Sequence, residues 1–231
     1  MALRTLLKGI TTIAALAMAL PGGVASAADA GWQSMGTKDG ISVSRKEVPG
    51  SPIIAFHGEG DIYAPLIQCA TVVLDDDRGP EWVDSLVEAK VVRVINPLEY
   101  IEFNHIGTPP LIRDRDFVTD VKMTVDPVAK SFTVKYQSVD EPLMPPGKWV
   151  RGEMMYTYFV LTSIDNGTRT HISCELFADP KGWLPKWLVN LFQQDWPINT
   201  IQGLRKQSAK KDIKRPAVFT EVLRQVEAVT H

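Results

Sequence analysis

The chain has few of the residues that metal and nucleophile chemistry use. Its 231 residues include two cysteines, Cys69 and Cys174, and four histidines. No CxxC pair or His/Cys cluster has the spacing of a zinc site. No serine has the G-x-S-x-G setting of a hydrolase nucleophile. The sequence therefore predicts no metal, no cofactor and no catalytic residue of these kinds, although an Asp or His pair in a pocket could still supply acid/base chemistry.

The two cysteines leave a choice open. Cys69 falls in a predicted helix and Cys174 on a predicted strand. An oxidising compartment would allow them to pair, but each equally suits the role of a small buried apolar residue. We favour two free buried thiols.

The chain also lacks an excess of basic charge. It has 25 Lys plus Arg against 27 Asp plus Glu, and a formal net charge of −2. Loss of residues 1–27 would remove Arg4 and Lys8 and no acid, leaving 23 basic against 27 acidic residues, a charge of −4. This balance argues against nucleic acid as a partner and against strong electrostatic attachment to anionic membranes.

A long apolar run is missing as well, since Ile10–Leu20 is too short for an ordinary membrane span. With Arg4 and Lys8 before it and Ala25-Ser26-Ala27 after it, Met1–Ala27 has the pattern of a secretory signal peptide. A retained N-terminal anchor is the alternative. Neither twin arginines nor a lipobox cysteine is present, so we expect a Sec-type route, with a bacterial periplasm as the destination.

Most of the chain alternates apolar and polar residues with the period of two that is typical of strands. The expected strands are Ile41–Val48, Ile53–Ile62, Ala89–Ile95, Glu99–Gly107, Arg115–Val125, Ser131–Val139, Met154–Ser163 and Thr170–Ala178. Turn-forming residues separate them, and short connections predict a hairpin followed by an antiparallel meander. Pro65–Leu74 and Glu81–Leu86 are predicted to be short helical inserts.

A long amphipathic helix is expected after the strands, from Pro185 to Lys211. Apolar residues recur along it at spacings of three or four. Pro197 removes one helical hydrogen bond, which predicts a kink, and a break into two helices is the alternative. The tail 212–231 is expected to end in a short helix. These elements together predict an α+β fold in which a curved antiparallel sheet wraps around the C-terminal helix.

Three motifs resemble those of the START family of lipid-transfer domains. They are Arg115-Asp116-Phe117-Val118, Trp149-Val150-Arg151-Gly152-Glu153 and Lys181-Gly182-Trp183-Leu184-Pro185-Lys186. Their order and spacing are similar to the family's over about Trp32 to Lys211, so we expect a START-like domain over 28–211. The resemblance implies the helix-grip fold with an apolar tunnel for one lipid. The sterol-handling branch has a buried Glu and Arg at positions that we match to Asn104 and Val121, so this pair is missing here.

Strand alternation and the helix stripe indicate which side chains face such a tunnel. The side chains expected to point inward are Thr119, Val121, Met123 and Val125 on one strand, Phe132, Val134 and Tyr136 on the next, and Ile172, Cys174 and Leu176 on the last. The cavity candidates are Tyr100, Asn104, Val121, Met123, Tyr136, Met154, Tyr156, Tyr158, Cys174, Leu188, Leu191, Asp195 and Ile198. Glu102 is an alternative polar contact.

Opening of the tunnel is expected at Gly182–Lys186 and at the loop Pro142–Lys148. Trp183 and Trp187 would then contact lipid headgroups, or else pack under the start of the helix. The charged motif residues Arg115, Asp116, Arg151 and Glu153 could contact a ligand, but we interpret them as structural, pairing with one another or capping strand ends to hold the sheet together.

We therefore expect a monomer that binds one lipid or other hydrophobic small molecule without catalysis, with transient membrane contact. An enzyme that acts on a polyketide-like or aromatic ligand in the same pocket is the alternative, and it would depend on a polar residue such as Glu102 or Asp195. A binding module that signals to a partner protein is neither supported nor excluded.

Overall fold

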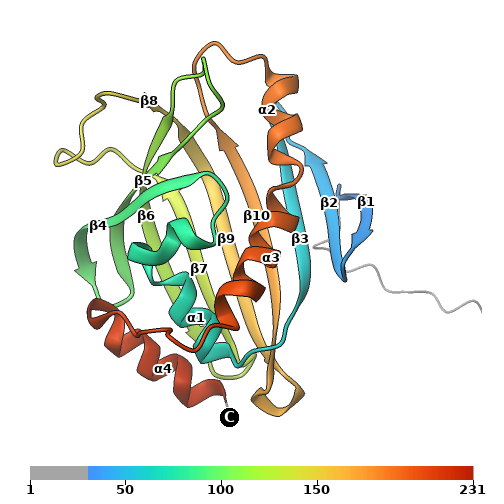
Figure 1. The fold of residues 1–231 in the computed structure, drawn as a ribbon, viewed down its shortest axis with the longest axis vertical. Coiled ribbons are helices and arrows are strands. Elements are labelled where there is room, and N and C mark those ends of the chain that lie inside the picture. Colours follow the sequence, from blue (N-terminus) through green and yellow to red (C-terminus); the bar gives the residue numbers. More distant parts are fainter. Residues whose placement is uncertain (1–30, 231) are drawn as a thin grey trace, which may run out of the picture. The chain divides into compact units, whose positions relative to one another are not determined.

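Residues 31–230 are described by a computed structural model in which one antiparallel sheet closes over helices (Figure 1). The strands are β1 (Gln33–Lys38), β2 (Ile41–Glu47), β3 (Ile54–Ile62), β4 (Leu86–Asn96), β5 (Glu99–Ile106), β6 (Arg115–Asp126), β7 (Ser131–Ser138), β8 (Val150–Arg151), β9 (Glu153–Ile164) and β10 (Arg169–Asp179). The helices are α1 (Leu66–Val73), α2 (Lys186–Gln193), α3 (Trp196–Ser208) and α4 (Thr220–Thr230), with short 3-10 segments η2 (Asp76–Glu81), η3 (Asp165–Gly167) and η4 (Ala217–Phe219).

The sheet order is β1-β2-β3-β10-β9-β7-β6-β5-β4, and β8 pairs with β6 in parallel. The predicted meander is confirmed from β4 to β10. The hairpin of β2 and β3 joins the sheet through pairing of β3 with β10, which places the first strands beside the last. Two strands were not predicted: β1, whose six residues are all exposed and show no alternation, and β8, which has only two residues.

The prediction of one kinked C-terminal helix is wrong, because the segment forms two helices with a turn at Gln194 and Asp195 between them. Pro197 is the second residue of α3, where its missing N–H would have had no helical partner. Its ring packs on β3 at Gly58, where an added Cβ would lie 2.5 Å from Pro197 Cβ. The absence of a side chain at Gly58 therefore lets α3 approach the sheet.

The inward faces of β6 and β10 are as predicted. Val121 and Met123 of β6, together with Ile172 and Cys174 of β10, are buried in the largest apolar cluster. Helices α1, α3 and α4 pack on this end of the sheet, and the ring of Phe219, just before α4, lies 4.8 Å from that of Tyr100. This end of the interior is thus filled by side chains, and a ligand cavity can lie only toward the other end.

Both cysteines are free and buried, Cys69 on α1 and Cys174 on β10, as we favoured. The second helical insert begins earlier than predicted, at Asp76, and ends at Glu81. None of the helices within residues 31–230 is long and apolar enough to cross a membrane. The predicted signal peptide lies outside the described residues.

Candidate functional site

A cavity of about 400 Å³ lies on the concave face of the sheet, beside α2 and η2. This volume falls within the roughly 300–1,000 Å³ that is usual for small-molecule sites. The sheet supplies mainly apolar walls, including Phe117, Phe159, Leu176 and Ala178, and the helical side supplies Leu184, Val189, Phe192 and Trp196. The arrangement therefore offers a hydrophobic ligand a largely dry environment.

Three of the predicted cavity residues, Asn104, Tyr136 and Met154, line this cavity, as does Glu102. Leu176, which was predicted to point inward, also lines it, but the other cavity candidates on strands do not. Tyr100, Val121, Met123 and Cys174 belong to the filled end of the interior, where α1 and α4 cover the sheet. Their inward orientation was predicted, but the packing of two further helices against them was not.

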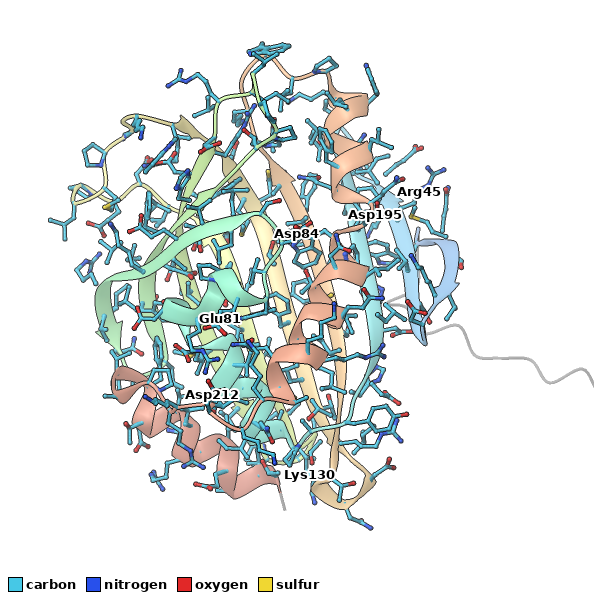
Figure 2. The ribbon with its side chains drawn as sticks, viewed as in Figure 1. Arg45, Glu81, Asp84, Lys130, Asp195 and Asp212 are labelled. Atoms are coloured by element: carbon cyan, nitrogen blue, oxygen red, sulfur yellow. The ribbon has the colours of Figure 1, made fainter. Side chains whose placement is uncertain are left out.

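The predicted helix residues also lie outside the cavity wall. Leu188 packs beside the cluster of Ile53 and Ala55, and Leu191 is half exposed. Asp195 sits at the junction between α2 and α3 (Figure 2), and Ile198 packs against the main core. The break between the two helices changes which side of each helix faces the sheet. The apolar face predicted for one continuous helix therefore does not identify the residues that line the cavity.

The prediction that Tyr156 and Tyr158 face the cavity is wrong. On β9 the buried residues are Thr157, Phe159 and Leu161, and the two tyrosine hydroxyls donate to Glu175 on the opposite face of the sheet. A bulge causes part of this error, because β9 has one extra residue between the partners of Phe177 and Ala178. The bulge returns Met154 to the cavity side while Tyr156 and Tyr158 stay outside.

One part of the cavity is polar and acidic. Glu102 of β5 is 5% exposed, and Asp76 of η2 lines the same cavity. Burial, and after it the Asp76 carboxylate, raises the pKa of Glu102 well above its ordinary range. Burial also raises the pKa of Asp76, to about 7, with smaller contributions from Asp77 and Asp75. Asp76 and Glu102 therefore both face the ligand space and hold their protons more tightly than usual, and Asp75 and Asp84 are the other two acidic residues that line the cavity.

The shifted pKa of Asp76 predicts a pH-dependent effect of Asp76→Asn on stability. Folded Asp76 keeps its proton up to about pH 7, whereas the unfolded chain releases it near 3.8, so Asp76 makes the fold less stable as the pH rises. The stabilisation by Asp76→Asn should therefore grow by about 2–3 kcal/mol between about pH 5 and about pH 8. Urea unfolding at both pH values measures it. The exposed Asp140→Asn is the control, and an equal effect of Asp76→Asn at both pH values would contradict the assignment.

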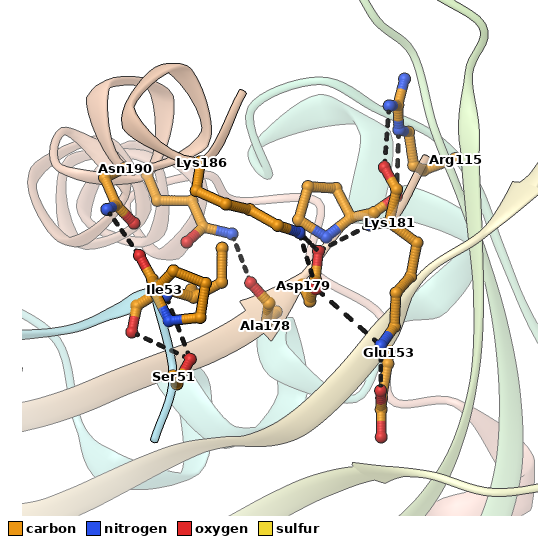
Figure 3. A network of polar contacts seen from close by, with 12 residues as sticks. Ser51, Ile53, Arg115, Glu153, Ala178, Asp179, Lys181, Lys186 and Asn190 are labelled. Carbon is orange, nitrogen blue, oxygen red and sulfur yellow. Dashed lines mark hydrogen bonds and ion pairs between the residues drawn. The ribbon is translucent and has the colours of Figure 1, made fainter. Parts of the chain in front are cut away.

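A polar network fixes the segment before α2 to the sheet (Figure 3). Arg115 donates from Nε to Pro180 O at 3.2 Å and from Nη2 to Lys181 O at 3.3 Å. Lys186 Nζ lies 2.8 Å from both carboxylate oxygens of Asp179, and Lys181 Nζ lies 2.6 Å from Glu153 Oε2. The start of α2 is thus held at the edge of the cavity by charges from β6, β9 and β10.

The charged motif residues pair only in part as predicted. Arg151 donates to both oxygens of the buried Asp116, at 3.1 and 3.0 Å, which ties β8 to β6. Arg115 and Glu153 instead bind the segment before α2. Arg115 also lines the cavity, and burial lowers the pKa of its guanidinium.

The cavity reaches the surface beside α2, because Phe192 both lines it and is half exposed. Trp183 and Trp187 are 76% and 68% exposed, so they do not pack under the helix start. Gly107, Thr108, Pro109 and Ile112 form the facing loop of the mouth. No residue of the predicted second gate loop, Pro142–Lys148, lines the cavity.

A sheet that closes over its C-terminal helices around one apolar cavity defines the helix-grip class of ligand-binding protein. Residues 23–210 match the START domain, so the chain belongs to the START domain family. An uncharacterized protein of Pseudomonas aeruginosa is 25% identical over 206 residues, which cover 89% of this chain and all of that protein. START domains are a lipid-binding and lipid-transfer fold.

Solved structures agree with the fold. Human StAR-related lipid transfer protein 5 superposes with a TM-score of 0.72 at 22% identity, covering 78% of this chain and 86% of that chain. A STAR-related lipid transfer protein fragment from Xanthomonas axonopodis gives a TM-score of 0.69 at 21% identity, covering 78% of this chain and 99% of that one. The predicted α+β helix-grip fold is confirmed.

Proposed function

We propose that this protein binds one hydrophobic molecule in the cavity and carries it between membranes without changing it chemically. The observation that supports this most strongly is the apolar cavity itself, which remains between the sheet, α2 and η2 after α1 and α4 have filled the rest of the interior. Each methylene exposed to water costs about 0.8 kcal/mol, so an enclosed apolar wall offsets much of the cost of leaving a bilayer.

The exposed aromatic residues at the mouth support transient membrane contact. Trp183 lies just before α2 and Trp187 in its first turn, close in sequence to the lining residues Leu184 and Val189, and Leu111 is fully exposed on the facing loop. Amphipathic tryptophans are favoured at the boundary of water and lipid. Lys181 and Lys186 are already paired with Glu153 and Asp179, so the proposed contact is apolar rather than electrostatic.

The membrane contact can be tested with the double variant Trp183→Ala, Trp187→Ala. Transfer of a fluorescent lipid between neutral phosphatidylcholine vesicles should slow by about tenfold or more, because about 1.4 kcal/mol of interfacial binding corresponds to that factor. Binding of the same lipid in solution should be unchanged. Val128→Ala, at an exposed site on the β6–β7 turn, is the matched control. An unaltered transfer rate in the double variant would show that the two tryptophans do not contribute to membrane contact.

Enzymatic action in the same cavity is the second candidate, and the two buried carboxyls favour it. Carboxyls with raised pKa values can act as general acids or bases near neutral pH. Of the two residues named for this role from sequence, Glu102 faces the cavity and Asp195 does not. If the protein converts a bound compound and Glu102→Gln abolishes that conversion, the enzymatic function is favoured over transfer of an unchanged ligand.

We propose further that the protein acts as a monomer and is exported by a Sec-type signal, to a bacterial periplasm. The support is the pattern of Met1–Ala27 in the sequence. The mass of the mature protein tests it: a chain that begins at Ala28 is expected, and an intact Met1 would favour a retained anchor.

A further inference from the structure

Unpaired polar atoms gather around the cavity. Among residues 31–230, nine buried side-chain nitrogen or oxygen atoms lack a hydrogen-bond partner within the protein, and five of them belong to residues that line this one cavity. They are Asp76 Oδ2, Trp82 Nε1, Glu102 Oε2, Thr157 Oγ1 and Gln193 Oε1. A buried polar atom without a partner costs about 1–3 kcal/mol, so such a concentration points to a ligand that supplies the missing bonds.

Most of these atoms accept hydrogen bonds. The amide oxygen of Gln193 and the ionised carboxyl of Asp76 are acceptors, and the carboxyl of Glu102 keeps an acceptor oxygen when it is protonated, whereas Trp82 is a donor and Thr157 can be either. Glu102 and Thr157 are 5% and 4% exposed, on β5 and β9, so their side chains are enclosed by the fold. Asp76 approaches from η2. The polar part of the cavity therefore suits a ligand group that donates hydrogen bonds.

The cavity offers little to an anion. Its one lysine or arginine lining residue, Arg115, donates to the carbonyl oxygens of Arg113, Pro180 and Lys181. The pKa of Asp76 is about 7, so above neutral pH its carboxylate would repel a negatively charged group brought beside it in a region of low dielectric constant. A carboxylate or phosphate placed there would also leave the acceptor atoms unpaired.

We propose that the cavity selects an amphipathic ligand whose head is an uncharged or cationic hydrogen-bond donor, a hydroxyl or an ammonium, bound at Asp76 and Glu102, and that it rejects carboxylate and phosphate heads there. The apolar tail extends along Phe159 and Leu176 toward Phe192 at the mouth. This inference rests on the proposed carriage of a hydrophobic molecule and adds the chemical class of its head.

A matched series of ligands tests the selection. Displacement of Nile red from the full mature protein at about pH 8, where Asp76 is ionised, is measured with dodecanol, dodecylamine and dodecanoate, which share one chain length and differ in the head. The alcohol and the amine should displace the dye at concentrations at least about tenfold lower than dodecanoate, a difference of about 1.4 kcal/mol. Equal or tighter binding of dodecanoate would overturn the inference.

Variants assign the selection to the two carboxyls. In the double variant Asp76→Asn, Glu102→Gln, the concentration of dodecanoate that displaces the dye should exceed that of the alcohol by about threefold or less. Asp76→Asn alone removes the carboxyl that is ionised in this assay, so it should give an intermediate value and serves if the double variant does not fold. Tyr158→Phe, on the opposite face of the sheet, should keep the full discrimination. Discrimination that survives in the folded carboxyl variants would overturn the assignment, whereas failure of all three ligands and of the dye to bind would contradict the proposed function itself.

Discussion

Replacement of Ala178 by tryptophan is expected to reduce binding of a hydrophobic ligand by about 100-fold or more while the protein remains folded. Ala178 lies on β10, is 3% exposed and lines the cavity next to Phe117 and Leu176. An indole ring added there must occupy ligand space. Overpacking of a filled core would cost about 1–3 kcal/mol, but a side chain that enters an existing cavity costs less.

The measurement is Nile red titration together with thermal unfolding. Ala129→Trp makes the same chemical change at an exposed position on the β6–β7 turn and should leave the affinity unchanged. If Ala178→Trp folds and binds the dye within about threefold of the unaltered protein, the ligand is not bound in this cavity, because a factor of three is only about 0.7 kcal/mol.

Replacement of Gly203 by alanine should lower the free energy of unfolding by about 3 kcal/mol. In an exposed helix the same change normally stabilises by about 0.5–1 kcal/mol, so the expected sign is reversed. The reason is a backbone contact: a Cβ on Gly203 of α3 would lie 2.2 Å from the carbonyl oxygen of Trp82. Because a carbonyl cannot rotate away as a side chain can, α3 must separate from the segment that follows η2.

This contact also supports the cavity, since Trp82 lines it. Asn199 of α3 donates to Asp84 at 3.1 Å and Gln207 donates to Glu81 at 3.1 Å, so these bonds hold η2 and the segment after it on α3. Figure 2 labels Glu81 and Asp84 on this part of the chain. Urea unfolding measures the predicted loss, with Gly147→Ala as a control where the nearest atom to an added Cβ is Pro145 O at 3.9 Å, an ordinary contact. If the free energy of unfolding of Gly203→Ala equals or exceeds that of the unaltered protein, the backbone of Gly203 does not lie close to the carbonyl of Trp82.

The sequence was sufficient to predict the sheet because the period of two is a local property. The predicted bounds of β5, β6, β7 and β10 lie within one residue of those observed. Helix α2 was joined to α3 in the prediction because the apolar period continues past Pro197. The break depends on the contact of Pro197 with Gly58, which lies on a strand far away in the sequence.

The cavity was harder to predict than the fold, because alternation shows which residues point inward but not what fills the space. Val121 and Asn104 both lie on cavity-forming strands, yet only Asn104 reaches the cavity, since other helices pack over Val121. Phe159 and Thr157 were missed because both faces of β9 are almost equally apolar. Asp76 falls between the two predicted helical inserts, and only the packing of η2 against β4 brings it into the same cavity as Glu102.

The most direct test of the account is native mass spectrometry of the mature protein purified from its own host, followed by extraction and identification of the bound molecule. The account predicts one hydrophobic molecule for each chain, with a hydroxyl or amine head, and its loss in Ala178→Trp. A protein that is recovered empty and takes up no hydrophobic ligand when supplied with host lipid extract would contradict lipid carriage.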